Sequence, residues 1–241
     1  MRPFTIHALE TTESTNLEAI ELAERGAPGG TVVVAQEQTA GIGRLGRSWD
    51  SPRGNLYFSV LLREHLQTHA LTFASALSVG ITLEQIFCDN AKGSNAWELR
   101  YKWPNDVLVN GKKISGVLLQ TKAHGDMVPW IVCGVGINVS CHPENATSMK
   151  YHIPNLELPT MELLNLVLEN FAKLLDVFSA SGFSALRNLW LKKAYKMGSN
   201  VCITTRSGSK HEGVFSDIDM DGAMVLKSGN DILKVDFGEM L

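Results

Sequence analysis

The sequence has little that would place it in a membrane, outside the cell or on a nucleic acid. It has no uninterrupted run of about 18 apolar residues, and its start, "MRPFTIHALETTEST", has no apolar core, so neither a membrane span nor an export signal is predicted. Its four cysteines show no C-x-x-C spacing, which argues against a zinc site or redox motif and fits free thiols in a reducing compartment. The formal net charge is -3, so no overall basic field attracts nucleic acid. We therefore expect a cytoplasmic protein with no membrane or DNA partner.

The composition is that of a globular protein, and the predicted secondary structure changes once along the chain, from mixed helices and strands to short strands alone. With 241 residues, of which 44% are hydrophobic, the chain can bury a full core and carry a second, smaller domain. A Thr15 to Glu18 capping box and helical periodicity predict a first helix that ends at Gly26, and further periodic or buried runs predict the other elements. The remaining predicted helices cover 71–87 and two segments of 160–197 that meet near Gly182, and the predicted strands cover 31–38, 55–62, 99–103, 106–109, 112–121 and 130–139. From Asn200 short strands and turns follow one another, so we predict an α+β domain with a mixed β-sheet and then a small β-barrel.

One loop, "AGIGRLGRSW" at 40–49, combines three glycines with two arginines. Glycine lets backbone N–H groups turn toward a ligand, and the arginine fork matches phosphate or carboxylate. The spacing Gly41-x-Gly43-x-x-Gly46 also fits a dinucleotide fingerprint, but the residues after Gly46 do not form a helical pattern, as that fingerprint requires. We therefore predict an anion-binding loop. A solvated basic surface is the alternative that charge alone leaves open.

A second segment, "YKWPNDVLVNGKKISGVLLQ" at 101–120, places a lysine at the end of a strand. The adjacent Trp103-Pro104 turn restricts the backbone, so the Lys102 ammonium can be aimed at a charged oxygen. Asn105 and Asp106 offer an amide and a carboxylate, which can recognise a base edge or hold Mg²⁺. An ordinary turn with a solvated lysine is the alternative reading of this segment.

Five motifs occur together along the chain. They are "ESTN" at 13–16, "GIGRLGRSW" at 41–49, "KWPND" at 102–106, "KKISGVLLQ" at 112–120 and "GVGINV" at 134–139. In order and approximate spacing they resemble the biotin protein ligases, over nearly the whole chain. The resemblance implies a biotin/lipoate ligase-like catalytic domain over 1–197 and an SH3-like β-barrel over 198–241. It also implies formation of biotinyl-5'-AMP from biotin and ATP, and transfer of the biotinyl group to a lysine of the biotin carboxyl carrier protein of acetyl-CoA carboxylase.

The resemblance assigns roles to individual side chains. It implies that Lys102 and Arg44 are catalytic, with Lys102 reaching both the biotin carboxylate and the α-phosphate of ATP. The residues implied to bind biotin are Ser14, Thr15, Asn16, Gln38, Ile42, Gly43, Arg44, Lys102, Gly116 and Leu118. Those implied to bind the nucleotide are Arg44, Arg47, Trp49, Asn105 and Asn138. Mg²⁺ would enter with ATP, near Asp106 or Asn138.

Two positions depart from the pattern of this family. Ile42 stands where the family loop G-R-G-R-x-G-R has its first arginine, which removes part of the expected hold on the adenylate, and Gln120 stands where glutamate is frequent. The chain enters the catalytic domain within its first dozen residues, without the helix-turn-helix of relatives that repress transcription, so DNA binding is not expected. Relatives often dimerise, which leaves a homodimer open. The alternatives are a lipoate or octanoate ligase of the same fold and a non-catalytic biotin-binding module.

Overall fold

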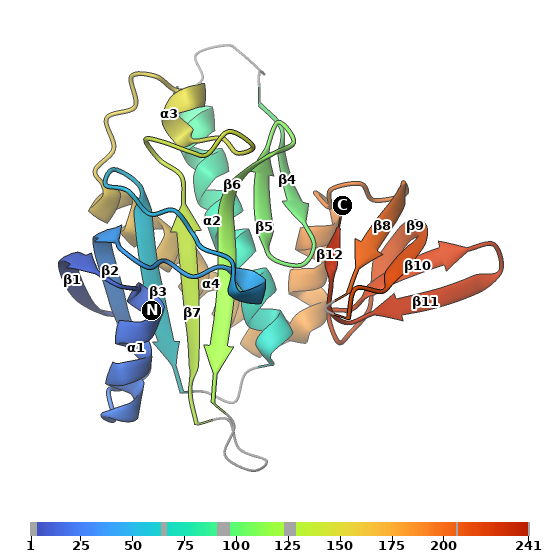
Figure 1. Cartoon of the computed structure of the whole chain (residues 1–241), viewed down its shortest axis with the longest axis horizontal. Coiled ribbons are helices and arrows are strands. Elements are labelled where there is room, and N and C mark those ends of the chain that lie inside the picture. Colours follow the sequence, from blue (N-terminus) through green and yellow to red (C-terminus); the bar gives the residue numbers. More distant parts are fainter. Residues whose placement is uncertain (1–3, 64–66, 91–96, 123–128, 206, 241) are drawn as a thin grey trace.

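A computed structural model describes residues 4–63, 67–90, 97–122, 129–205 and 207–240. Its larger part is a seven-stranded sheet in the order β1-β2-β3-β7-β6-β5-β4 (Figure 1). The strands are β1 (Thr5–Thr12), β2 (Thr31–Gln38), β3 (Leu56–Leu62), β4 (Leu99–Lys102), β5 (Asp106–Val109), β6 (Lys112–Thr121) and β7 (Ile131–Ile137). β1 runs parallel to β2 and every other pair is antiparallel, so the sheet is mixed, as predicted.

Helices cover the two faces of this sheet unequally. The long helices α2 (Thr68–Asn90) and α4 (Thr160–Leu191) pack on each other and on one face, where they enclose the main core. The short helix α1 (Thr15–Glu24) lies over β2, β3 and β7 on the other face, above Val33 and Val132. Because α1 has only 10 residues, it covers one end of that face and leaves the other end free for the loop that follows β2 (Figure 1).

The structure tests two predictions about helices, the break near Gly182 and the capping box at Thr15. The segment α4 is interrupted at Gly182, whose φ of 68° and ψ of -174° are not helical, so two helical segments meet near that residue, as predicted. The capping box is wrong. Ser14 precedes α1 as its N-cap and makes no side-chain cap, and Glu18 accepts a hydrogen bond from Thr12 rather than from the helix start.

Helix α2 has the length and the hydropathy of a membrane-spanning helix. Among the described residues it is the one helix long and apolar enough to cross a bilayer, with a mean hydropathy of 1.4 in its most apolar window. However, 72% of that window is buried inside the protein. Its apolar character is therefore that of a core helix packed between α4 and the sheet.

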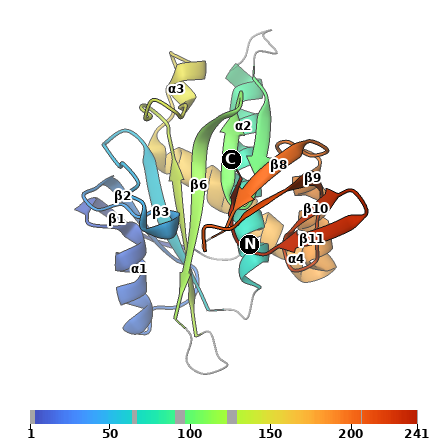
Figure 2. The same cartoon turned by 45° about the vertical axis from the view of Figure 1, so that its right-hand side comes forward.

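The C-terminal part is a separate five-stranded antiparallel sheet with the order β11-β10-β9-β8-β12. Its strands are β8 (Asn200–Thr204), β9 (Lys210–Ile218), β10 (Met224–Ser228), β11 (Asp231–Val235) and β12 (Glu239–Met240). The sheet lies beside the β4–β5–β6 end of the large sheet and against α4 (Figure 2). Several contacts join the parts, among them a hydrogen bond from the Trp103 indole N–H to the Gly222 carbonyl at 3.0 Å and the ion pair of Arg187 with Asp217.

Candidate functional site

The glycine-arginine loop between β2 and β3 is folded on itself as a short hairpin. Gly43 N–H donates to the Arg47 carbonyl at 2.7 Å, and Trp49 N–H donates to the Gly41 carbonyl at 2.8 Å. Ile42 and Ser48 form an isolated antiparallel bridge across it. The loop leads into strand β3 and not into the helix that a dinucleotide fingerprint requires.

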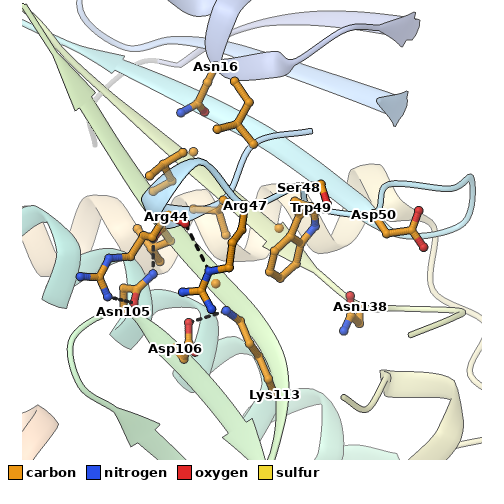
Figure 3. A pocket seen from close by; sticks show the side chains of 18 of the residues that line it. Asn16, Arg44, Arg47, Ser48, Trp49, Asp50, Asn105, Asp106, Lys113 and Asn138 are labelled. Atoms are coloured by element: carbon orange, nitrogen blue, oxygen red, sulfur yellow. Dashed lines mark hydrogen bonds and ion pairs between the residues drawn. The ribbon is translucent and has the colours of Figure 1, made fainter. Parts of the chain in front are cut away.

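The two arginines of this loop are held in different ways. Arg44 is half-buried and donates through Nη1 to the Asn105 side-chain oxygen at 3.1 Å, so the loop contacts the turn after β4 (Figure 3). Arg47 is exposed and pairs with Glu239 at 2.9 Å, with Nε directed to the Arg44 carbonyl at 3.4 Å. The loop therefore presents two guanidinium groups at the edge of one cavity.

The start of α1 forms a buried polar cluster at one end of this cavity. Ser14, Thr15 and Asn16 are 2%, 3% and 4% exposed. Gln38, at the end of β2, accepts hydrogen bonds through Oε1 from the Thr15 amide at 2.9 Å and from its hydroxyl at 3.1 Å. Gln38 thus supplies the acceptor for a free N–H of the first helical turn, as a capping side chain would, and this explains why the capping box is not formed.

Asn16 completes the same cluster. Its Oδ1 lies 2.5 Å from the Ser59 hydroxyl, and its Nδ2 donates to Gln120 Oε1 at 2.7 Å. Gln120, which stands where the family often has glutamate, therefore keeps an acceptor facing Asn16. A carboxylate at 120 would accept the same bond, so this departure leaves the cluster intact.

Three glycines on the middle strands make room for side chains from elsewhere. Gly116 of β6 and Gly136 of β7 are directly paired in the sheet, and the Trp49 ring lies over both, since a Cβ at 136 would come within 2.6 Å of the indole. Gly134, on the same face of β7, is occupied in the same way by the Asn16 amide. The "GVG" pattern thus removes side chains where a ligand pocket meets the sheet.

Basic and acidic groups from β4 to β6 form the opposite wall. Lys102 and Asp106 are directly paired residues of β4 and β5, and Lys113 of β6 forms an ion pair with Asp106 at 2.7 Å (Figure 3). The Lys113 ammonium also lies 5.1 Å from the centre of the Trp49 ring. Burial lowers the pKa of Lys102, while Asp106 and Glu239 oppose that effect.

Most of these groups line one cavity of about 420 Å³, a size typical of small-molecule sites. It brings together every residue that was given a catalytic, binding or metal role from the sequence: Ser14, Thr15, Asn16, Gln38, Ile42, Gly43, Arg44, Arg47, Trp49, Lys102, Asn105, Asp106, Gly116, Leu118 and Asn138. Their individual roles stay predictions.

Sequence reasoning missed several residues of the wall. Lys113, Gly134 and Gly136 lie inside quoted motifs, but no role was assigned to them. Glu239, near the C-terminus and 192 residues from Arg47 in sequence, carried no signal at all. Phe237, two residues before it, has its ring centre 4.9 Å from the Arg44 guanidinium. Their positions depend on how the two sheets pack.

No group of three or more histidine, cysteine, aspartate or glutamate side chains that could hold a metal occurs among the described residues. Asp106 is already paired with Lys113 and Glu239 with Arg47, and the cations Lys102 and Arg44 also act on Asp106. This donor set fits a Mg²⁺ ion that retains phosphate and water ligands and takes few ligands from the protein.

Comparisons with known proteins find similar sequences and similar structures over most of this chain. A model of the biotin/lipoate A/B protein ligase family matches residues 8–138. A biotin--[acetyl-CoA-carboxylase] ligase of Paracoccus denitrificans is 34% identical over 91% of this chain and 92% of its own length. The bifunctional ligase/repressor BirA of Bacillus subtilis is 33% identical over 94% of this chain and 70% of its own length. The structure of a biotin protein ligase from Aquifex aeolicus in complex with biotin and ATP superposes with a TM-score of 0.82 at 29% identity, covering 98% of this chain and 97% of that one.

Proposed function

The chain belongs to the biotin/lipoate A/B protein ligase family, and from this we propose that its cavity is the active site of a biotin protein ligase. The enzyme forms biotinyl-5'-AMP from biotin and ATP and then transfers the biotinyl group to a lysine of a carrier protein. One observation supports this more than any other. Two loop arginines and Lys102 face one cavity whose other end is a buried, uncharged polar cluster.

The polar cluster fits the uncharged ring end of biotin. Ser14, Thr15, Asn16 and Gln38 offer hydroxyl and amide groups at a helix start, where hydrogen-bond donors gather. Gly116 and Leu118 of β6 would supply the floor for the apolar part of the ligand. In this orientation the carboxylate of biotin points toward Lys102 and the loop.

The first step brings two anions together. A biotin carboxylate oxygen attacks the α-phosphorus of ATP, and the bond to the pyrophosphate oxygen breaks. Lys102, whose backbone is fixed at the end of β4, holds a positive charge beside both groups. Arg44 of the glycine-arginine loop, held by Asn105, adds a second positive charge. Preorganised cations of this kind stabilise the charge that develops in the transition state.

The second step releases AMP. The amine of the carrier lysine attacks the biotinyl carbonyl carbon, the bond between that carbon and the AMP oxygen breaks, and the amine gives up a proton to water. Lys102 and Arg44 stay beside the leaving phosphate and stabilise it. Arg47, whose side chain is 56% exposed, lies at the solvent-facing edge of the cavity, where we expect the carrier lysine to enter.

The remaining lining fits the nucleotide. Trp49 offers an aromatic face. The Asn105 amide already bonds Arg44 and the Val117 carbonyl, and the Asn138 amide bonds the Thr147 carbonyl. These two side chains would therefore contact the nucleotide through the remaining acceptor capacity of their oxygens. Mg²⁺ bound to the triphosphate would neutralise part of its charge, with Asp106 or Asn138 the nearest oxygen donors of the protein. We also propose that the carrier is that of acetyl-CoA carboxylase, that the enzyme works in the cytoplasm and that it does not bind DNA. A homodimer is compatible with these roles.

Intact-mass measurement of a biotin-carrier domain tests this function. With biotin, ATP and Mg²⁺ we expect a gain of one biotinyl group, and no gain when ATP or Mg²⁺ is left out. Replacing biotin with lipoate or octanoate tests the alternative that the enzyme is a lipoate or octanoate ligase of the same fold. Biotin binding without pyrophosphate release would identify a non-catalytic module, and the absence of transfer by folded protein would refute the assignment.

A further inference from the structure

A side chain of the small C-terminal sheet reaches the proposed active site. Glu239 belongs to β12, which pairs with β8 in that sheet, yet its carboxylate lines the cavity and accepts a hydrogen bond from Arg47 Nη1 at 2.9 Å. The preceding residue, Gly238, accepts one from Arg44 Nη2 at 3.2 Å through its carbonyl. Both loop arginines are thus contacted by one short segment from the far end of the chain.

The Glu239 carboxylate faces the cations that the phosphates would need. Burial acts to raise its pKa, but the hydrogen bond from Arg47 and the charges of Arg47, Lys102 and Arg44 outweigh burial and leave the pKa below its usual range. At neutral pH Glu239 is therefore a negative charge inside a cation-lined cavity. A phosphate group of the substrate would have to share or displace it.

The contact with Arg47 can be exchanged readily. The Arg47 side chain is 56% exposed and the Glu239 side chain 38% exposed, and such pairs contribute little to stability. A phosphate offers the same guanidinium a charge-assisted, bidentate partner. The ion pair can therefore break when an anionic substrate enters and form again when a product leaves.

We propose that Glu239 is a built-in competitor of the phosphate groups: it occupies Arg47 in the empty enzyme and promotes the release of pyrophosphate and AMP by taking that arginine back. This extends the proposed function, since it concerns anions in the same cavity. The opposite role is a positioning one, in which Glu239 holds Arg47 in place for the phosphate. The two roles predict opposite signs for the removal of its charge.

Calorimetry of pyrophosphate binding to the whole chain, without biotin or ATP, distinguishes the two roles, because removal of the Glu239 charge should strengthen binding in the first and weaken it in the second. Glu239→Gln keeps the shape and an acceptor for Arg47 but removes the charge, and we expect pyrophosphate to bind about fivefold more tightly, which corresponds to about 1 kcal/mol. Glu239→Asp keeps the charge and should stay closer to wild type than the glutamine variant. The gain should shrink as salt is added, because exposed charges are screened.

Glu212→Gln is the matched control, because Glu212 is an exposed carboxylate on β9 of the same sheet and does not line the cavity. It removes the same charge and should leave pyrophosphate affinity unchanged. Weaker or unchanged binding by Glu239→Gln, no binding by either protein, or an equal gain in Glu212→Gln would overturn the proposal. Biotinylation of a carrier domain by the wild-type protein is scored separately, so a failure of the ligase assignment is distinguishable from a failure of this one.

Discussion

Replacing Gly134 with alanine would put a methyl group where the Asn16 amide lies. The new Cβ would overlap the amide oxygen and come within 2.8 Å of Cγ. Asn16 is 4% exposed, and Ser59 and Gln120 fix its amide at 2.5 Å and 2.7 Å. The side chain cannot turn aside without losing those two hydrogen bonds.

The cost follows from these contacts. Two hydrogen bonds of roughly 0.5 to 1.5 kcal/mol each, lost together, amount to about 1 to 3 kcal/mol. Forcing an extra methyl group into a packed site adds roughly 1 to 3 kcal/mol. We therefore expect Gly134→Ala to lower the free energy of unfolding by about 2 to 6 kcal/mol. Because Asn16 is expected to face biotin, we also expect biotin affinity to fall by about tenfold or more, which corresponds to at least about 1.4 kcal/mol.

Denaturant unfolding and calorimetric titration with biotin measure the two effects. Gly136→Ala is the matched control, since it makes the same change two residues along β7 but meets the Trp49 ring at 2.6 Å instead of Asn16. We expect it to weaken nucleotide binding more than biotin binding. If Gly134→Ala keeps both the stability and the biotin affinity of the wild type, Asn16 has room to move and the reasoning from the glycine is refuted.

Two further substitutions test the proposed chemistry. Lys102→Ala should slow adenylate formation by roughly a hundredfold or more, because a preorganised cation is worth about 3 kcal/mol at the transition state; pyrophosphate release within threefold of wild type would assign that role to another residue. Ile42→Arg should slow the dissociation of biotinyl-AMP by about tenfold, since a charge-assisted hydrogen bond to a phosphate or carboxylate contributes roughly 1.5 to 3 kcal/mol; unchanged or faster release would show that the cavity has adapted to isoleucine.

Features that depend on neighbouring residues could be predicted from the sequence. The predicted strands 106–109 and 112–121 lie where the pattern placed them, and the two residues between them, Asn110 and Gly111, have φ angles of 50° and 76°, as a two-residue hairpin turn requires. The cavity residues were also found, because short motifs carry them. In both cases the information is held within a few consecutive positions.

Features that depend on distant partners could not be predicted. β1 was missed because it is a mostly exposed edge strand without a clear apolar pattern, and only its pairing with β2 defines it. The Thr15 cap was wrong because Gln38, 23 residues away, supplies the acceptor instead. Glu239 was missed because it reaches the cavity only after the small sheet has packed beside the large one.

The indole of Trp103 has a consequence for how the molecule unfolds. Trp103 is 2% exposed, follows Lys102 directly and donates its one N–H to Gly222 in the turn between β9 and β10. If the small sheet melted first, this buried donor would lose its acceptor, at a cost of roughly 1 to 3 kcal/mol, and the backbone that carries Lys102 would lose its support. The two sheets therefore share cooperativity, and heat should abolish catalysis and the C-terminal fold in the same transition.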